Sequence, residues 1–163
     1  MRQFARDQAT LNGQSSLNDF ERLREDAFGL GPAELAALSV TWQARGIWHE
    51  IRGGAAQTRL HLQAAVDLPL QCQRCLEPVQ ERLSVDREFL FVVDEATAMK
   101  VDDGSELDVL AASKTFNLLE LIEDELLMAL PLVAMHDQCT PPLPLMPDGP
   151  RNPFEALKGL KRG

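Results

Sequence analysis

The stretch Leu60-His61-Leu62-Gln63-Ala64, which runs on toward Val66, alternates apolar and polar residues. Successive side chains of a β-strand point to opposite faces, so this period of two predicts a half-buried strand. Residues 38–44 alternate in the same way, and a later run places four apolar residues on one parity: Leu83, Val85, Phe89 and Phe91. Strands this close along the chain tend to pair as hairpins. The pattern predicts an antiparallel β-sheet, with a barrel-like curl as one form of it.

One amphipathic helix, over residues 117–130, is predicted to cover the apolar face of this sheet. It opens with a capping box in which Asn117 is the N-cap and Glu120 reaches back. Four apolar positions form one stripe at helical spacing, with the acidic residues mostly away from it: Leu118, Ile122, Leu126 and Ala129. Pro131 ends the helix. A sheet covered by a helix places the chain in the α+β class.

Two smaller segments complete the predicted body. Asn18 and Glu21 have the spacing of a second capping box and predict a short helix through Leu23. Residues 94–108 carry six acidic side chains against one lysine, and we expect a solvated, mobile loop there. This run lacks the spacing of a calcium-binding loop, so it does not predict a cation site.

The chain divides at residue 139 into two parts. Residues 1–139 are predicted to form a single α+β domain, and residues 140–163 begin with a proline-rich linker that should be extended. The chain ends in a short basic amphipathic segment that is predicted to dock on a partner, with a frayed terminus as the alternative. Its candidate binding residues are Arg151, Phe154, Lys158, Lys161 and Arg162.

The chain is acidic, with a net charge of −9 over 163 residues. Nucleic acid repels such a protein as a whole, so contact with RNA requires a local basic patch, whereas basic proteins are attracted. No stretch is apolar over the ~20 residues of a membrane helix, and the start has no signal-peptide pattern. Three cysteines are too few for a secreted disulfide scaffold. These observations predict a cytoplasmic protein that does not bind membranes.

The motif Cys72-Gln73-Arg74-Cys75 is the part of the chain with recognisable chemistry. A redox dithiol normally lies at a helix N-terminus, whereas this motif lies between two predicted strands. A structural zinc ion needs four nitrogen or sulfur ligands, and His136 with Cys139 supplies a second pair just past the predicted helix. The third interpretation is that Cys72 and Cys75 are small buried residues in a tight turn. The residues alone leave these three alternatives open.

Three blocks of sequence carry a family resemblance. They are LPLQCQRCLEPV at 68–79, LLELIEDELLMALPLVAMHDQC at 118–139 and RNPFEALKGLKRG at 151–163. In this order they are similar to the YceD family of large ribosomal RNA subunit accumulation proteins. The resemblance implies a bacterial cytoplasmic protein that is needed for the accumulation of 23S ribosomal RNA, through its synthesis, processing or stability. Many members carry further cysteines after the helix, which implies metal in those branches, whereas this chain has only His136 and Cys139 there.

The sequence predicts a non-enzymatic factor, because no histidine has a nucleophile beside it in the sequence and the family lends no catalytic residues. The expected partners are a ribosomal protein or assembly factor, the 23S ribosomal RNA precursor, or both, and no small-molecule substrate. Arg74, at the tip of the cysteine turn, is a candidate RNA contact in the body, together with Arg82 and Arg87. Trp42 and Trp48 are the residues that could stack on bases, but Trp42 has the parity of a core residue, and the place of Trp48 is undecided. The alternatives are a zinc- or thiol-dependent RNA-processing enzyme and a redox chaperone.

Overall fold

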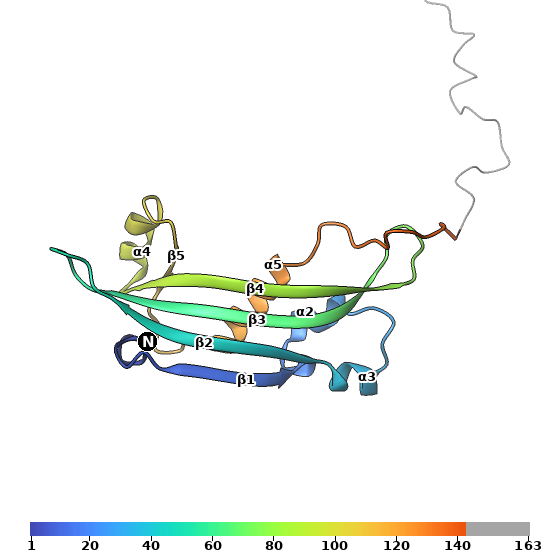
Figure 1. Cartoon of the computed structure of the whole chain (residues 1–163), viewed down its shortest axis with the longest axis horizontal. Coiled ribbons are helices and arrows are strands. Elements are labelled where there is room, and N and C mark those ends of the chain that lie inside the picture. Colours follow the sequence, from blue (N-terminus) through green and yellow to red (C-terminus); the bar gives the residue numbers. More distant parts are fainter. Residues whose placement is uncertain (143–163) are drawn as a thin grey trace, which may run out of the picture.

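The computed structural model describes residues 1–142 and shows an α+β protein built on one open sheet (Figure 1). The predicted tail residues from Arg151 onward lie outside the described residues. Strands cross the sheet in chain order: β1 (Thr10–Ser16), β2 (Ser39–His49), β3 (Gln57–Gln71), β4 (Pro78–Val92) and β5 (Asp108–Ala111). The α+β class is therefore confirmed.

The sheet is mixed and open, which corrects two expectations. β1 to β4 pair antiparallel, but β5 runs parallel to β4, with Phe89 opposite Asp108. A parallel pair needs a crossover connection, and the segment between β4 and β5 supplies it through α4 (Glu95–Asp102). β1 and β5 are the two edges and do not pair with each other, so no barrel closes.

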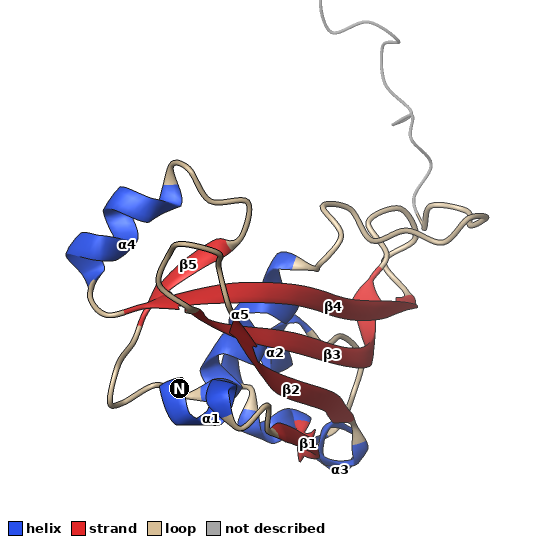
Figure 2. Ribbon diagram, turned by 60° about the vertical axis from the view of Figure 1, so that its left-hand side comes forward, coloured by secondary structure: helices blue, strands red, loops and turns tan. Residues whose placement is uncertain are grey.

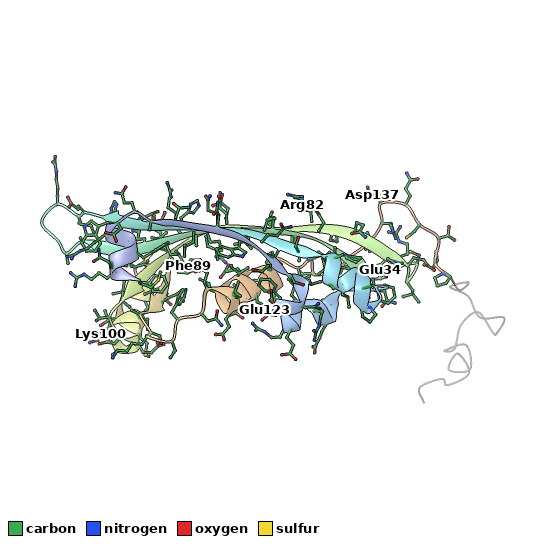
Figure 3. All side chains as sticks on the ribbon, turned by 90° about the horizontal axis from the view of Figure 1, so that it is seen from below. Glu34, Arg82, Phe89, Lys100, Glu123 and Asp137 are labelled. Atoms are coloured by element: carbon green, nitrogen blue, oxygen red, sulfur yellow. The ribbon has the colours of Figure 1, made fainter. Side chains whose placement is uncertain are left out.

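The period of two correctly predicts the buried face of the sheet. This face is built by even-numbered residues of β3 and odd-numbered residues of β4, among them Leu60, Leu62, Leu68, Leu83 and Phe89. α5 (Leu118–Met128) packs across this face (Figure 2). It contributes Ile122 and Leu126, which are both fully buried. Figure 3 shows Phe89 and Glu123 on this helix side, while Arg82 projects from the opposite, polar face.

The prediction of a single covering helix is too simple. In the part of the chain that the structure describes, four shorter helices and a 3-10 turn accompany α5: α1 (Arg2–Arg6), η1 (Leu17–Asp19), α2 (Glu21–Asp26), α3 (Pro32–Ala37) and α4. Asn117 is the N-cap of α5 as predicted, and its side chain accepts a hydrogen bond of 3.1 Å from the Leu119 N–H. The cap predicted at Asn18 is wrong, because the Ser16 hydroxyl accepts the Asn18 N–H and places Asn18 inside η1. Within residues 1–142, no helix is both long and apolar enough to span a membrane.

A buried glutamate joins α2 to α5. The Glu123 carboxylate accepts the backbone N–H groups of Arg22 and Leu23 at 2.8 and 3.2 Å, and the Arg22 guanidinium at 3.0 Å. It takes the place of an N-cap side chain for α2, because Phe20 at the N-cap position has no side-chain oxygen to offer. The helical pattern placed Glu123 away from the apolar stripe, whereas the structure leaves it only 7% exposed.

The acidic segment at 94–108 is ordered, contrary to the predicted mobile loop. The Asp94 carboxylate accepts the Thr97 N–H at 2.8 Å and caps α4, and the chain then enters β5 at Asp108. A carboxylate at a helix N-terminus satisfies a free N–H group and faces the positive end of the helix dipole. Ala98 anchors the helix because it is buried. The local cap therefore outweighed the high charge of the segment.

Candidate metal centre

The Cys72–Cys75 motif forms the turn that joins β3 to β4 at one end of the sheet. Two backbone hydrogen bonds of 2.9 Å close this turn: the Cys72 N–H donates to the Glu77 carbonyl, and the Leu76 N–H donates to the Cys72 carbonyl. Leu76 has a φ of 65°, a left-handed conformation that is uncommon for residues other than glycine. The tight turn brings the Sγ atoms of Cys72 and Cys75 within 4.8 Å of each other.

The segment after α5 brings a second pair of ligands to this turn. The Gln73 N–H donates to the Ala134 carbonyl at 2.9 Å and ties the two segments together. The His136 Nδ1 lies 3.3 Å from the Cys75 Sγ, and the Cys139 Sγ lies 3.8 Å from the Cys72 Sγ. The structure thus gathers all four side chains that the sequence singled out, although the contacting partners are 61 and 67 residues apart in the chain.

The thiols of this cluster differ in their protonation. Burial opposes ionisation of Cys72, but hydrogen bonds from the backbone of Cys75, His136 and Arg74 outweigh it and lower the pKa of Cys72 to about 5. Burial and then the contacts with Cys72 and Cys75 raise the pKa of Cys139 to about 11. Without a cation, one thiolate therefore lies beside a thiol that keeps its proton. A bound cation would remove that proton, because a coordinating thiol is deprotonated outright.

The donor set of the cluster fits a metal ion. One ligand atom from each of Cys72, Cys75, His136 and Cys139 lies within 4.8 Å of every other. Thiolate and imidazole suit transition metals, whereas magnesium and calcium take oxygen ligands. In a tetrahedral site with zinc–sulfur bonds of ~2.3 Å, the sulfurs lie about 3.8 Å apart. The Cys72 and Cys139 sulfurs are separated by 3.8 Å, so the cluster could hold one metal ion.

The surroundings of the cluster are exposed and partly apolar. Arg74 lies at the tip of the turn, and its Nη2 is 3.9 Å from the Met135 Sδ. Exposed apolar side chains flank it: Leu76, Leu132, Val133 and Met135. The predicted RNA contact of Arg74 stays a prediction. The tail candidates Arg151, Phe154, Lys158, Lys161 and Arg162 lie outside the described residues.

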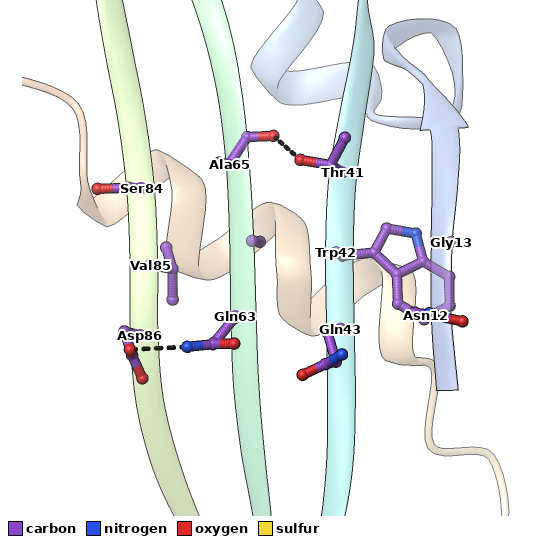
Figure 4. A pocket seen from close by; sticks show the side chains of 11 residues that line it. Asn12, Gly13, Thr41, Trp42, Gln43, Gln63, Ala65, Ser84, Val85 and Asp86 are labelled. Atoms are coloured by element: carbon purple, nitrogen blue, oxygen red, sulfur yellow. Dashed lines mark hydrogen bonds between the residues drawn. The ribbon is translucent and has the colours of Figure 1, made fainter. Parts of the chain in front are cut away.

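A hollow lies on the polar face of the sheet (Figure 4). It has a volume of about 600 Å³, and its polar lining residues are Asn12, Thr41, Gln43, Gln63, Ser84 and Asp86. Gln63 donates to Asp86 at 2.9 Å, and the Asp86 carboxylate also lies 2.6 Å from the ring of His61. The hydrogen bond with Gln63, which has the larger effect, and the hydrogen bond with His61 lower the pKa of the Asp86 carboxyl group. Asp86 is therefore held by two neighbouring side chains.

The sequence missed a group of arginines at the other end of the sheet. The Cζ atoms of Arg2 and Arg6, in α1, lie 5.8 and 4.8 Å from the centroid of the Trp48 ring near the end of β2. A spacing of four residues puts two side chains on one helix face, and this was the only available signal. Trp42, by contrast, packs against the core as predicted, and its ring N–H donates to the Ser15 hydroxyl.

Fold and cluster together define a small α+β protein with a candidate metal site at one turn of its sheet. The family profile described as Large ribosomal RNA subunit accumulation protein YceD matches residues 60–161, so the chain belongs to the YceD family and the resemblance is confirmed. A curated relative of that name from Haemophilus influenzae is 34% identical over 110 residues, which cover 60% of this chain and 62% of the relative. The chain thus matches less than two thirds of that relative's length. No solved structure matches the chain.

Proposed function

We propose that this protein is a non-enzymatic factor that supports the accumulation of 23S ribosomal RNA in large-subunit assembly, with a structural zinc ion that holds the Cys72–Cys75 turn. Family membership supports the ribosomal part of the proposal. The complete ligand set supports the structural part, because four protein ligands fill a tetrahedral zinc site. Catalytic zinc sites keep one position open for water or substrate.

The alternative is a zinc- or thiol-dependent RNA-processing enzyme. The 3.3 Å contact between the Cys75 Sγ and the His136 Nδ1 is also the geometry of a nucleophile and its base. Such a pair needs an orienting third group and space for a substrate beside it. Here the sulfurs of Cys72 and Cys139 converge on the same point. This arrangement favours metal coordination over attack on a substrate.

The negative charge of residues 1–142 supports the proposal that the partner is a basic protein. Up to Pro142 the chain contains 12 basic and 23 acidic residues, a net charge of −11. Such a surface attracts basic proteins and speeds their association. The proposed partners are therefore a ribosomal protein or assembly factor and the 23S ribosomal RNA precursor, met in the cytoplasm. The basic end of the chain, residues 151–163, would contact RNA or the ribosome.

Loss of the gene tests the proposal directly. We expect such cells to contain less large-subunit than small-subunit ribosomal RNA, and expect the wild-type chain but not Cys139→Ser to restore the balance. An unchanged balance would refute the ribosomal role. Incubation of the purified protein with precursor ribosomal RNA separates the alternative, because cleavage that Cys75→Ser abolishes would establish an enzyme. The metal content of the same preparations tests whether zinc is bound.

A further inference from the structure

Five arginines gather on α1 and the β2–β3 hairpin at the end of the sheet that lies opposite the metal centre, and the acidic segment at 94–108 lies at the same end (Figure 1). Residues 1–7 and 45–61, which include α1 and the β2–β3 hairpin, contain five arginines and two acidic residues, although the whole chain has a charge of −9. Gly46 lets these two segments meet. A Cβ at this position would lie 2.6 Å from the Phe4 carbonyl oxygen and 2.8 Å from the Ala5 Cα. The close approach of backbones therefore fixes α1 on β2.

Trp48 lies among these charges. Its half-buried ring has the guanidinium groups of Arg2 and Arg6 within 5.8 and 4.8 Å of its centroid. Neither arginine takes part in a salt bridge with any residue of the described chain 1–142. Arg59 on the neighbouring strand is different, because it pairs with Glu88 at 2.8 Å. Arg2 and Arg6 can therefore bind an external anion without first breaking an internal ion pair.

A hollow beside this ring is suited to a nucleobase. Arg6, Trp48 and Glu50 line it together with apolar residues of the hairpin, and its volume is about 490 Å³. Pockets for small ligands span ~300–1,000 Å³. The Glu50 carboxylate repels a phosphate from the hollow, but it can accept a hydrogen bond from the amino group of a base. The hollow therefore fits a base, and Arg6, which lines it, fits the adjoining phosphates together with Arg2, which lies over the same ring.

We propose that Arg2, Arg6, Trp48 and Glu50 form a binding surface for single-stranded RNA. Proteins recognise unpaired RNA by stacking splayed bases on aromatic rings and arginine planes, while cations hold the backbone. A base in a duplex is stacked and paired and does not reach such a hollow. The surface rests on the proposed role in ribosomal RNA accumulation and deepens it, because it gives the body an RNA contact separate from Arg74 and from the tail.

Binding of a fluorescent single-stranded RNA to the full-length protein tests this surface. An oligonucleotide of about 12 nucleotides is suitable, since single-strand sites cover ~4–16 nucleotides. We expect the double variant Arg2→Ala/Arg6→Ala to bind about tenfold more weakly in low salt and to show a shallower salt dependence, because two phosphate contacts are lost. Arg82→Ala removes an exposed positive charge nearer the cysteine end of the sheet and should bind like the wild type.

Variants of the hollow test the base contact. Trp48→Leu should weaken binding at least fivefold through lost stacking, whereas Trp48→Phe keeps a ring and should lose less. Glu50→Gln should reduce any preference for cytosine-rich over uracil-rich RNA. Photo-crosslinked RNA should be recovered on the peptide that contains Trp48. Circular dichroism checks that each variant is folded.

Three results would overturn the surface. These are wild-type RNA affinity in the Arg2→Ala/Arg6→Ala variant, crosslinks confined to Arg74 or the tail, and binding of acidic peptides in place of RNA. The first two results would leave the proposed function standing, because RNA would then bind elsewhere on the protein. Failure of the proposed function has a different signature, namely unchanged ribosomal RNA balance after loss of the gene.

Discussion

The two ends of β3 show how one strand can support two unlike loops. At its C-terminal end, the Cys72–Cys75 turn faces His136 and Cys139, and the ligand atoms of all four converge within 4.8 Å. At its N-terminal end, the hairpin meets α1, and guanidinium groups without a described salt-bridge partner surround Trp48. At the first end the side chains can together fill the coordination sphere of one metal ion. At the second end the positive charges of Arg2 and Arg6 remain available to a ligand. The long sheet between them keeps a stabilising site and a binding site apart, so their substitutions should act independently.

Of the changes considered, loss of the metal should lower the free energy of unfolding most. The structural change should be confined to the cysteine end of the sheet. Cys139→Ser removes a ligand from the cluster, so we expect it to lose zinc and to lower the free energy of unfolding by on the order of 4 kcal/mol. Thermal unfolding with metal analysis measures both. A chelator should destabilise the wild type but have no further effect on Cys139→Ser. Equal zinc content in the two proteins would contradict the assignment.

Removal of Glu123 should destabilise the packing of α2 on α5. It should change neither the cysteine end nor the hairpin end of the sheet specifically. Glu123→Ala leaves the N–H groups of Arg22 and Leu23 without their acceptor and deletes an ion pair, which should cost about 3 kcal/mol. Denaturant unfolding measures this cost. Among residues 1–142 the structure describes no hydrogen bond to the exposed Glu120 side chain, so its predicted reach back to the N-cap is not seen. Glu120→Ala, in the same helix, should therefore stay within about 0.5 kcal/mol of the wild type. A loss of zinc in folded Glu123→Ala would show that the helices and the metal site are coupled.

A methyl group at Gly46 should damage only the hairpin end. Because a Cβ would lie 2.6 Å from the Phe4 carbonyl oxygen, Gly46→Ala should displace α1 and lower the free energy of unfolding by about 2 kcal/mol. RNA affinity should fall with it, while the zinc content stays unchanged. Gly104→Ala is the matched control, because its Cβ would meet no atom closer than 4.0 Å. Hydrogen exchange of α1 would locate the change, and unaltered protection there would argue against a packed α1.

Arg6→Ala should have the smallest effect on stability, and it distinguishes a role in RNA binding from a role in folding. Arg6→Ala removes one cation from the Trp48 ring, an interaction worth about 0.5–1 kcal/mol at an exposed site. Its RNA affinity should nevertheless fall severalfold, because the phosphate contact is lost as well. Arg6→Lys should regain part of that affinity. A change in the midpoint of unfolding without any change in RNA affinity would mean that Arg6 serves the fold alone.

The features that the sequence predicts correctly depend on residues close together in the chain. Leu60, Leu62 and Phe89 alternate with polar residues because their strands bury one face, and Asn117 caps its helix through a bond two residues away. The four candidate ligands were visible because each pair lies in one short segment and sulfur and imidazole have few alternative roles in such pairs. The meeting of the two pairs, by contrast, depended on the fold.

Residues whose partners lie far away in the chain were predicted wrongly or incompletely. Glu123 looked solvated because the N–H groups that it accepts lie about a hundred residues upstream in the chain. The charge of residues 94–108 concealed a capped helix and the parallel strand that follows it. Arg2 and Trp48 meet through a close backbone approach at Gly46, which no periodicity reports.

Strand order has a consequence for the order of assembly. Each of β1 to β5 pairs with its neighbour in the chain, and short sequence separations allow such pairs to form early. The β3–β4 hairpin can therefore form long before its turn is complete, since His136 and Cys139 are synthesised some sixty residues later. Zinc would therefore bind last, after the sheet has formed. During synthesis on the ribosome, the chain would thus carry a formed Trp48 hairpin before it carried a closed cysteine cluster.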